Sequence, residues 1–103
     1  MTDQEILQLY RSGEREKAFR GLVSNYKERL YWHIRRMVLD HDDTDDCLQN
    51  TFIKVWQSLD RFRGESQLYT WLYRIATNET LTFLTKQQTR GDQTVLTAAE
   101  RLS

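Results

Sequence analysis

The chain has 103 residues, with 15 basic and 15 acidic side chains, four glycines and no proline. This length fits one domain with a single core, and the scarcity of turn-forming residues argues against a β-rich fold. The single cysteine, Cys47, excludes an internal disulfide and fits a reducing cytoplasm, where we expect the protein to be located. No signal peptide begins the chain, and no apolar run approaches the roughly 20 residues that span a membrane, so we expect no membrane contact.

Charge is distributed in blocks along the chain. Residues 15–39 carry seven basic and two acidic side chains, and residues 40–60 carry six aspartates and one lysine. Residues 61–90 carry five basic and two acidic side chains. Such blocks are typical of surfaces directed at different partners, although solvated helix faces would give the same pattern.

Two helices are predicted in the first 39 residues. The first is a short amphipathic helix over residues 3–11, with Thr2 or Asp3 as its N-cap. From residue 14 to 39, apolar side chains recur at steps of three and four, which predicts a long second helix. These side chains are Phe19, Leu22, Val23, Tyr26, Leu30, Ile34, Met37 and Val38. Gly21 costs this helix about 1 kcal/mol relative to alanine, which indicates a close helix contact there.

The third helix is predicted to begin with Asp43 as its N-cap and to end near Leu59. Asp45 and Asp46 would then lie in its first turn, where the helix dipole favours acidic groups. Its apolar positions are Cys47, Leu48, Phe52, Val55, Trp56 and Leu59.

The fourth helix is predicted over about residues 67–87, after a loop with Gly64 in its middle and Ser66 as the N-cap. Its inward-facing residues are expected to be Leu68, Leu72, Ile75, Ala76 and Phe83. The expected fold is all-α, a three-helix bundle with an additional short N-terminal helix. Residues 1–90 would form this domain, and residues 91–103 a loose linker with at most a short helix.

Motifs for metal binding and catalysis are absent from the sequence. Asp40, Asp42 and Thr44 resemble the start of a calcium loop, but the sixth and twelfth positions are Asp45 and Thr51 rather than glycine and glutamate. The sequence has no zinc-ligand spacing, no glycine-rich phosphate loop and no nucleophile motif. We therefore expect neither an enzyme nor a bound metal or cofactor.

Arginine, aromatic and amide side chains are concentrated between residues 61 and 78. Aromatic rings can stack on unpaired bases, arginines bind phosphates, and a loop before a helix can hold an extruded base. The candidate DNA-binding residues are Arg61, Phe62, Arg63, Gly64, Ser66, Tyr69, Trp71, Arg74 and Asn78. The pattern alone also fits a buried Trp71 among solvent-exposed arginines.

Three motifs of this region carry a family resemblance. They are DTDDCLQNTFIKVW at residues 43–56, FRGES at residues 62–66 and YTWLYRIATN at residues 69–78. In this order they closely resemble region 2 of the sigma-70 family of RNA polymerase sigma factors, extracytoplasmic-function group. The resemblance extends over about residues 5–90. It implies region 2.1 at about residues 14–39, region 2.2 at 43–60, region 2.3 at 61–77 and region 2.4 at 74–87.

The resemblance also implies partners. In this family region 2.2 binds the clamp helices of the polymerase β′ subunit, and regions 2.3 and 2.4 melt and read the promoter −10 element as a single non-template strand. The implied polymerase-binding residues are Asp45, Asp46, Gln49, Asn50 and Lys54. Many relatives carry an acidic residue where this chain has Asn50, so one polymerase contact is expected to be altered. Anti-sigma factors commonly cover region 2 in this family, so such a partner is expected as well.

Two other functions fit the sequence. One is a helical protein-interaction module without direct DNA contact, and a weaker one is an RNA-binding helical domain. A preference for single-stranded −10 sequences would distinguish promoter recognition from both. Residues after 90 leave no room for the helix-turn-helix of region 4, so we expect a region 2 domain separated from region 4.

Overall fold

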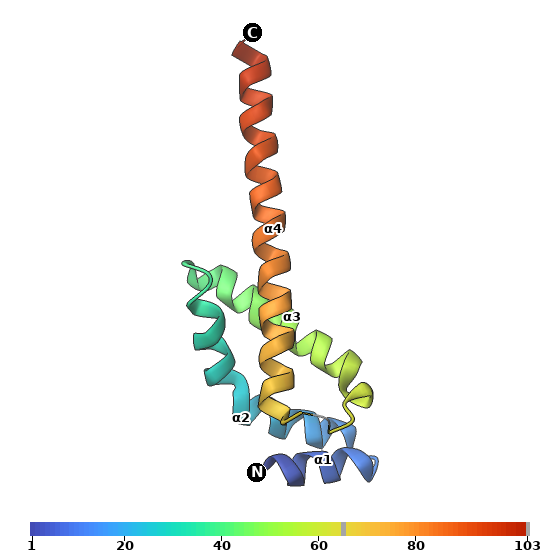
Figure 1. The fold of residues 1–103 in the computed structure, drawn as a ribbon. Helices are drawn as coiled ribbons and strands as arrows, with labels where there is room; N and C mark the ends of the chain where they lie inside the picture. Colours follow the sequence, from blue (N-terminus) through green and yellow to red (C-terminus); the bar gives the residue numbers. More distant parts are fainter. Residues whose placement is uncertain (65, 103) are drawn as a thin grey trace.

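Four helices make up the regular structure of the described residues. The computed structural model describes residues 1–64 and 66–102, and the side chains of residues 1–64 and 66–87. The elements are α1 (Asp3–Arg11), α2 (Arg15–Arg35), α3 (His41–Ser58), the 3₁₀ turn η1 (Leu59–Arg61) and α4 (Leu68–Leu102). Helices α2, α3 and α4 pack against one another, and α1 packs against the start of α2 (Figure 1). The predicted all-α bundle with a short N-terminal helix is confirmed.

The core lies where the three long helices meet. On α2 the buried residues follow one another at every fourth position: Ala18, Leu22, Tyr26, Leu30 and Ile34. On α4 the same spacing buries Leu68, Leu72 and Ala76. Each buried leucine or isoleucine contributes about 1.5–3 kcal/mol relative to an exposed one. Phe19, Phe52 and Trp56, which the apolar spacing includes, are half-buried at the edge of this core.

Three threonines are also fully buried, which the sequence did not predict. Each hydroxyl donates to the backbone carbonyl four residues earlier, at 2.8 Å for Thr44, 2.7 Å for Thr51 and 2.7 Å for Thr80. A buried hydroxyl without a partner would be unfavourable, so these bonds allow threonine at core positions.

Helix α3 begins before the predicted N-cap. Its N-cap is Asp40, and the backbone carbonyl of Asp40 accepts a hydrogen bond from the Thr44 amide at 3.0 Å. The predictions of Asp43 as N-cap and of Asp45 and Asp46 in the first turn were therefore wrong, because Asp42 and Asp43 occupy that turn. The burial of Thr44 gives the physical reason, because its amide and its hydroxyl both donate to the Asp40 carbonyl, which requires the helix to start at Asp40. Helix α2 correspondingly ends at Arg35, before the predicted end at Leu39.

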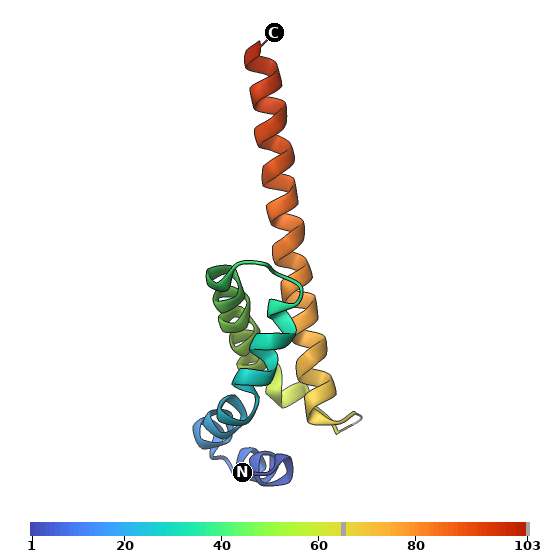
Figure 2. The ribbon, with the colours of Figure 1, turned by 90° about the vertical axis from the view of Figure 1, so that its left-hand side faces the viewer.

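Helix α4 differs from its prediction at both ends. It begins at Leu68, and the Gln67 carbonyl accepts the first helical hydrogen bond, from the Trp71 amide at 3.2 Å. Gln67 therefore occupies the N-cap position that was predicted for Ser66. The helix continues past Gln87 to Leu102 and projects beyond the bundle (Figures 1 and 2). Residues 91–102 are thus helical rather than a loose linker. No proline interrupts them, and Gly91 lowers helix stability by about 1 kcal/mol, which does not end the helix.

Helix α1 is held against α2 by its N-terminal residues. Thr2, one of the two residues predicted as N-cap of this helix, caps α1 through a capping box with Glu5. A side chain on Gly21 would begin 2.7 Å from Met1 Sδ and 3.4 Å from Ile6 Cγ1, so the predicted close contact at this glycine is confirmed. The Tyr26 hydroxyl donates to the Asp3 carboxylate at 2.8 Å.

The Tyr26–Asp3 hydrogen bond predicts a pH-dependent stability. Burial, with the hydrogen bond to Asp3, raises the pKa of Tyr26 to about 12. Because the ordinary tyrosine pKa is about 10, the unfolded chain ionises first as the pH rises. The stabilisation is therefore complete below about pH 10 and lost between about pH 10 and 12.

In Tyr26→Phe we expect a loss of about 1.5 kcal/mol in the free energy of unfolding at pH 7, the scale of a hydrogen bond to a charged group. We also expect a flatter decline than wild type above pH 10. Urea unfolding measures the free energy of unfolding at pH 7 and its decline with pH. The decline is followed at several values from about pH 9 to 12, on either side of the ordinary tyrosine pKa. Tyr69→Phe, which leaves the hydrogen bond intact, is the control. Equal slopes for Tyr26→Phe and wild type above pH 10 would contradict the assignment.

Candidate nucleic-acid interface and apolar groove

A short loop joins α3 to α4 through η1. The backbone becomes extended at Phe62, with φ −70° and ψ 118°. Gly64 has a φ of 76°, a left-handed conformation that other residues adopt at a cost. A Cβ at Gly64 would meet nothing within 4 Å, so backbone conformation rather than space explains this glycine. The loop therefore reverses the chain while its side chains stay beside the first turns of α4.

Beside this loop the surface is hollowed into a depression of about 390 Å³, here called the loop depression. The residues lining it are Arg61, Phe62, Arg63, Ser66, Trp71 and Arg74. The rings of Phe62 and Trp71 lie 5.2 Å apart at a tilt of 50°. Both rings are half-buried, whereas the three arginines are exposed. The arrangement offers flat apolar surfaces next to three cations, which suits a base with its phosphates.

The outer face of α4 continues away from the loop depression. Arg74 and Asn78 are both exposed and lie one helical turn apart, so they share a face of the helix. The prediction that Asn78 is not part of the core is confirmed. Its backbone carbonyl accepts a hydrogen bond from the Thr82 hydroxyl at 2.9 Å, while its exposed side-chain amide faces solvent.

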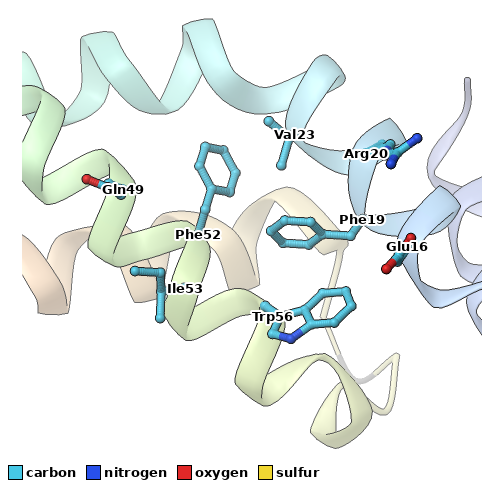
Figure 3. A pocket seen from close by; sticks show the side chains of 8 residues that line it. All are labelled: Glu16, Phe19, Arg20, Val23, Gln49, Phe52, Ile53 and Trp56. Carbon is cyan, nitrogen blue, oxygen red and sulfur yellow. The ribbon is translucent and has the colours of Figure 1, made fainter.

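On another face of the bundle, α2 and α3 enclose an apolar groove of about 520 Å³ (Figure 3), here called the α2–α3 groove. The residues lining it are Glu16, Phe19, Arg20, Val23, Gln49, Phe52, Ile53 and Trp56. The Phe19 ring packs edge to face against Phe52 at 6.3 Å and against Trp56 at 5.1 Å. Ile53 is 49% exposed, and charged and polar groups occupy the rim.

Comparison with known proteins decides the family. A family model described as Sigma-70 region 2 matches residues 22–90. The chain belongs to the sigma-70 region 2 family.

Several sigma factors are similar to this sigma-70 region 2 chain. It is 42% identical over 90 residues to the ECF RNA polymerase sigma-E factor of Haemophilus influenzae, an alignment that covers 87% of the chain and 47% of that protein. It is 38% identical over 100 residues to the protein of that name from Escherichia coli K12, covering 97% and 51%. The chain thus spans about half the length of the curated relatives it matches.

A solved structure is also similar. It is described as an "NMR structure of the complex formed by an engineered region 2 of sigmaE in complex with GTAAAA". Its sequence is 36% identical, the alignment covers 87% of this chain and 93% of that one, and the TM-score is 0.78.

In this region 2 chain the structure brings together most of the candidate DNA-binding residues. Six of them line the loop depression, and Gly64 shapes the loop. Asn78 lies on the continuing face of α4. Tyr69 is separate from them, because its ring packs edge to face against Tyr73, with 6.2 Å between the ring centroids. Nothing in the sequence predicts that the Tyr69 side chain points toward Tyr73.

The candidate polymerase-binding residues lie on α3. Gln49 lines the α2–α3 groove, and Asp45, Asp46, Asn50 and Lys54 are exposed along the same helix. Asp45 pairs with His41 at 3.2 Å, which places an imidazole beside the acidic start of α3.

The α2–α3 groove was not predicted, because the apolar spacing assigned its aromatic residues to the core. One signal was available: Phe52 and Ile53 are adjacent in a helix and cannot both face one core.

Among residues 1–64 and 66–87, no three acidic, histidine or cysteine side chains come together as a metal site. Within the described helices none is long and apolar enough to cross a membrane.

Proposed function

We propose that this chain is the promoter-opening domain of a sigma factor, which binds core RNA polymerase and captures the promoter −10 element as a single non-template strand. The observation that carries the proposal is the loop depression, where three arginines surround two aromatic rings. Membership of the sigma-70 region 2 family supports it, as does the similar region 2 that was solved in complex with GTAAAA.

The proposed mechanism is selective capture, without bond-making chemistry. Promoter DNA opens transiently, and one base leaves the stack and enters the loop depression beside the Phe62 and Trp71 rings. The arginines bind the neighbouring phosphates. Extruding the base costs a few kcal/mol, which stacking on the aromatic rings and binding of the phosphates offset. Because the closed duplex cannot make these interactions, binding shifts the equilibrium toward open DNA.

A selection experiment tests this function. The chain is incubated with a pool of single-stranded DNA that carries six randomised positions between fixed flanks, and the bound molecules are sequenced. We expect enrichment of one hexamer family, with tighter binding to single strands than to the matching duplex. A pool that remains random would favour the protein-interaction module, and stronger binding to an RNA pool would favour the RNA-binding domain.

The arginines of the loop depression make a separate prediction about salt dependence. Each of Arg61→Ala, Arg63→Ala and Arg74→Ala should weaken binding to all single strands about equally. The slope of log affinity against log salt should become shallower by about 0.7 for each phosphate that the variant no longer neutralises.

These slopes are measured by fluorescence anisotropy at salt concentrations from about 50 to 300 mM. This range includes about 100 mM, where the Debye length is about 10 Å. Arg11→Ala, which removes an exposed arginine on α1, is the control that should keep the wild-type slope. If the three variants also keep the wild-type slope, these arginines are solvated and do not bind phosphate.

We further propose that α3 and the α2–α3 groove form the polymerase-docking surface, with the β′ clamp helices as the partner. An amphipathic helix typically lays its apolar side chains into such a groove. Ile53 and the aromatic rings would supply apolar contact. Gln49 at the rim and the exposed Asp45, Asp46, Asn50 and Lys54 would set the orientation through polar contacts.

An anti-sigma factor that covers these same surfaces would block both activities, and we propose it as the regulatory partner. Because promoter DNA and polymerase lie in the bacterial cytoplasm, the proposed function places the chain there.

A further inference from the structure

A second depression, of about 430 Å³, lies between α2 and α4, and the proposed function does not use it. Its cationic and aromatic lining residues are Arg29, Trp32 and His33 on α2, Arg36 directly after the end of α2, and Tyr73 on α4. Helices α2 and α4 pack side by side here (Figures 1 and 2). We call this site the α2–α4 depression.

Its aromatic rings are held in place by neighbouring side chains. The Tyr73 ring stacks on His33, with centroids 4.8 Å apart and planes 15° apart, and His33 Nε2 lies 2.7 Å from the Thr77 hydroxyl. Trp32 is 54% exposed, yet its ring is fixed edge to face against Tyr31 at 5.1 Å. Rings that are already ordered lose little conformational entropy when a ligand stacks on them.

The charged groups of the depression favour an anion. Arg29 and Arg36 are exposed and lie seven residues apart, about 10 Å along the helix, with Trp32 between them on the same side. The Arg29 guanidinium is 4.5 Å from the centre of the Tyr26 ring, which fixes one of these cations.

Other titratable groups alter this balance little. Among the described residues that line the depression, Glu28 is acidic. Burial, together with Arg36, lowers the pKa of His33, so its imidazole is neutral at pH 7. Two arginines against one glutamate leave a cationic surface with an exposed indole, the combination that binds the backbone and bases of single strands.

The α2–α4 depression and the loop depression both use the first turns of α4, where Tyr73 lines the former and Trp71 and Arg74 line the latter. Tyr73 and Arg74 are consecutive in a helix, so their side chains point about 100° apart around one axis. A strand held at the loop can therefore continue around α4 onto α2.

We propose that the α2–α4 depression binds the nucleotides of single-stranded DNA that flank the base held by the loop, with Trp32 stacking on a base and Arg29 and Arg36 binding phosphates. This inference rests on the proposed function of the loop depression. A protein partner fits the site less well, because an apolar partner is better served by the α2–α3 groove.

Oligonucleotides of two lengths test the inference. The probes are the hexamer selected from the randomised pool, and the same hexamer with six thymidines added at its 5′ or its 3′ end. Affinities are measured by fluorescence anisotropy. We expect one extended probe to bind wild type about tenfold more tightly than the hexamer, the scale of one stacked base. Trp32→Ala and Arg36→Ala should each lose most of this gain and still bind the hexamer as wild type does.

Matched variants separate stacking from folding and from general charge. Trp32→Phe keeps an aromatic ring and should retain most of the gain. Lys27→Ala removes an exposed cation of α2 that does not line the depression, and should keep all of it.

The inference is overturned if extension adds no affinity, or if the gain survives both Trp32→Ala and Arg36→Ala. It is also overturned if these variants weaken polymerase binding while leaving DNA binding intact, which would indicate a protein contact. A hexamer bound without sequence preference would overturn the proposed function and, with it, this inference. Normal hexamer binding with no gain on extension overturns the inference alone.

Discussion

Ile53→Asp is expected to weaken binding of the chain to core RNA polymerase by about 30-fold or more, the scale of a hot-spot residue. Ile53 is 49% exposed in the α2–α3 groove, where a docked helix would cover it. A carboxylate there would lose water on docking without gaining a partner, which is strongly unfavourable. Because the side chain is half-exposed in the free chain, we expect a change in melting temperature of no more than a few degrees. Pull-down with core polymerase measures the first effect, and circular dichroism the second.

The chain offers a closely matched control for this substitution. Leu81 is 50% exposed in the middle of α4, so Leu81→Asp places the same charge at an equally exposed aliphatic position outside the groove. It should leave polymerase binding unchanged. At the α3 surface, Asp46→Arg combined with Gln49→Ala should weaken binding severalfold. Polymerase binding of folded Ile53→Asp at wild-type strength would remove the groove from the docking surface.

The helices could be predicted from the sequence because the apolar spacing repeats over several turns. The start of α3 could not, because Asp40, Asp42 and Asp43 are all aspartates and each can cap a helix equally well. What decides between them is the burial of Thr44, which depends on tertiary packing. The end of α4 was missed because residues 86–94 are all polar or glycine and resemble a linker, although no proline breaks the helix there.

The loop depression was predicted better than the α2–α3 groove. Arginine, aromatic and glycine residues close together in the chain mark a site that one loop and one helix turn can build. The groove instead combines residues of α2 and α3 that lie far apart in the chain, such as Phe19 and Phe52. Helical spacing gives an apolar face but does not say whether another helix of the same chain covers it.

Asn78→Ala is expected to lower discrimination at a single promoter position by roughly 1–3 kcal/mol, about 5- to 150-fold, and to spare the other positions. Asn78 is exposed on the face of α4 that also carries Arg74. Its amide can donate and accept hydrogen bonds at once, which suits a base edge. Stability should change by no more than about 0.5 kcal/mol, because the side chain lies at the surface.

The measurement compares wild type and Asn78→Ala on promoter DNA with every single-base substitution across the −10 element. Wild type should bind the preferred base at one position best, and the variant should bind all four bases there alike. Gln57→Ala, which removes an exposed amide on α3, should keep the wild-type profile. If Asn78→Ala loses affinity equally on every promoter, the amide binds the DNA backbone. If it loses none, Asn78 takes no part in binding, and sequence preference must come from the loop depression, where Phe62, Trp71 and the arginines surround the extruded base.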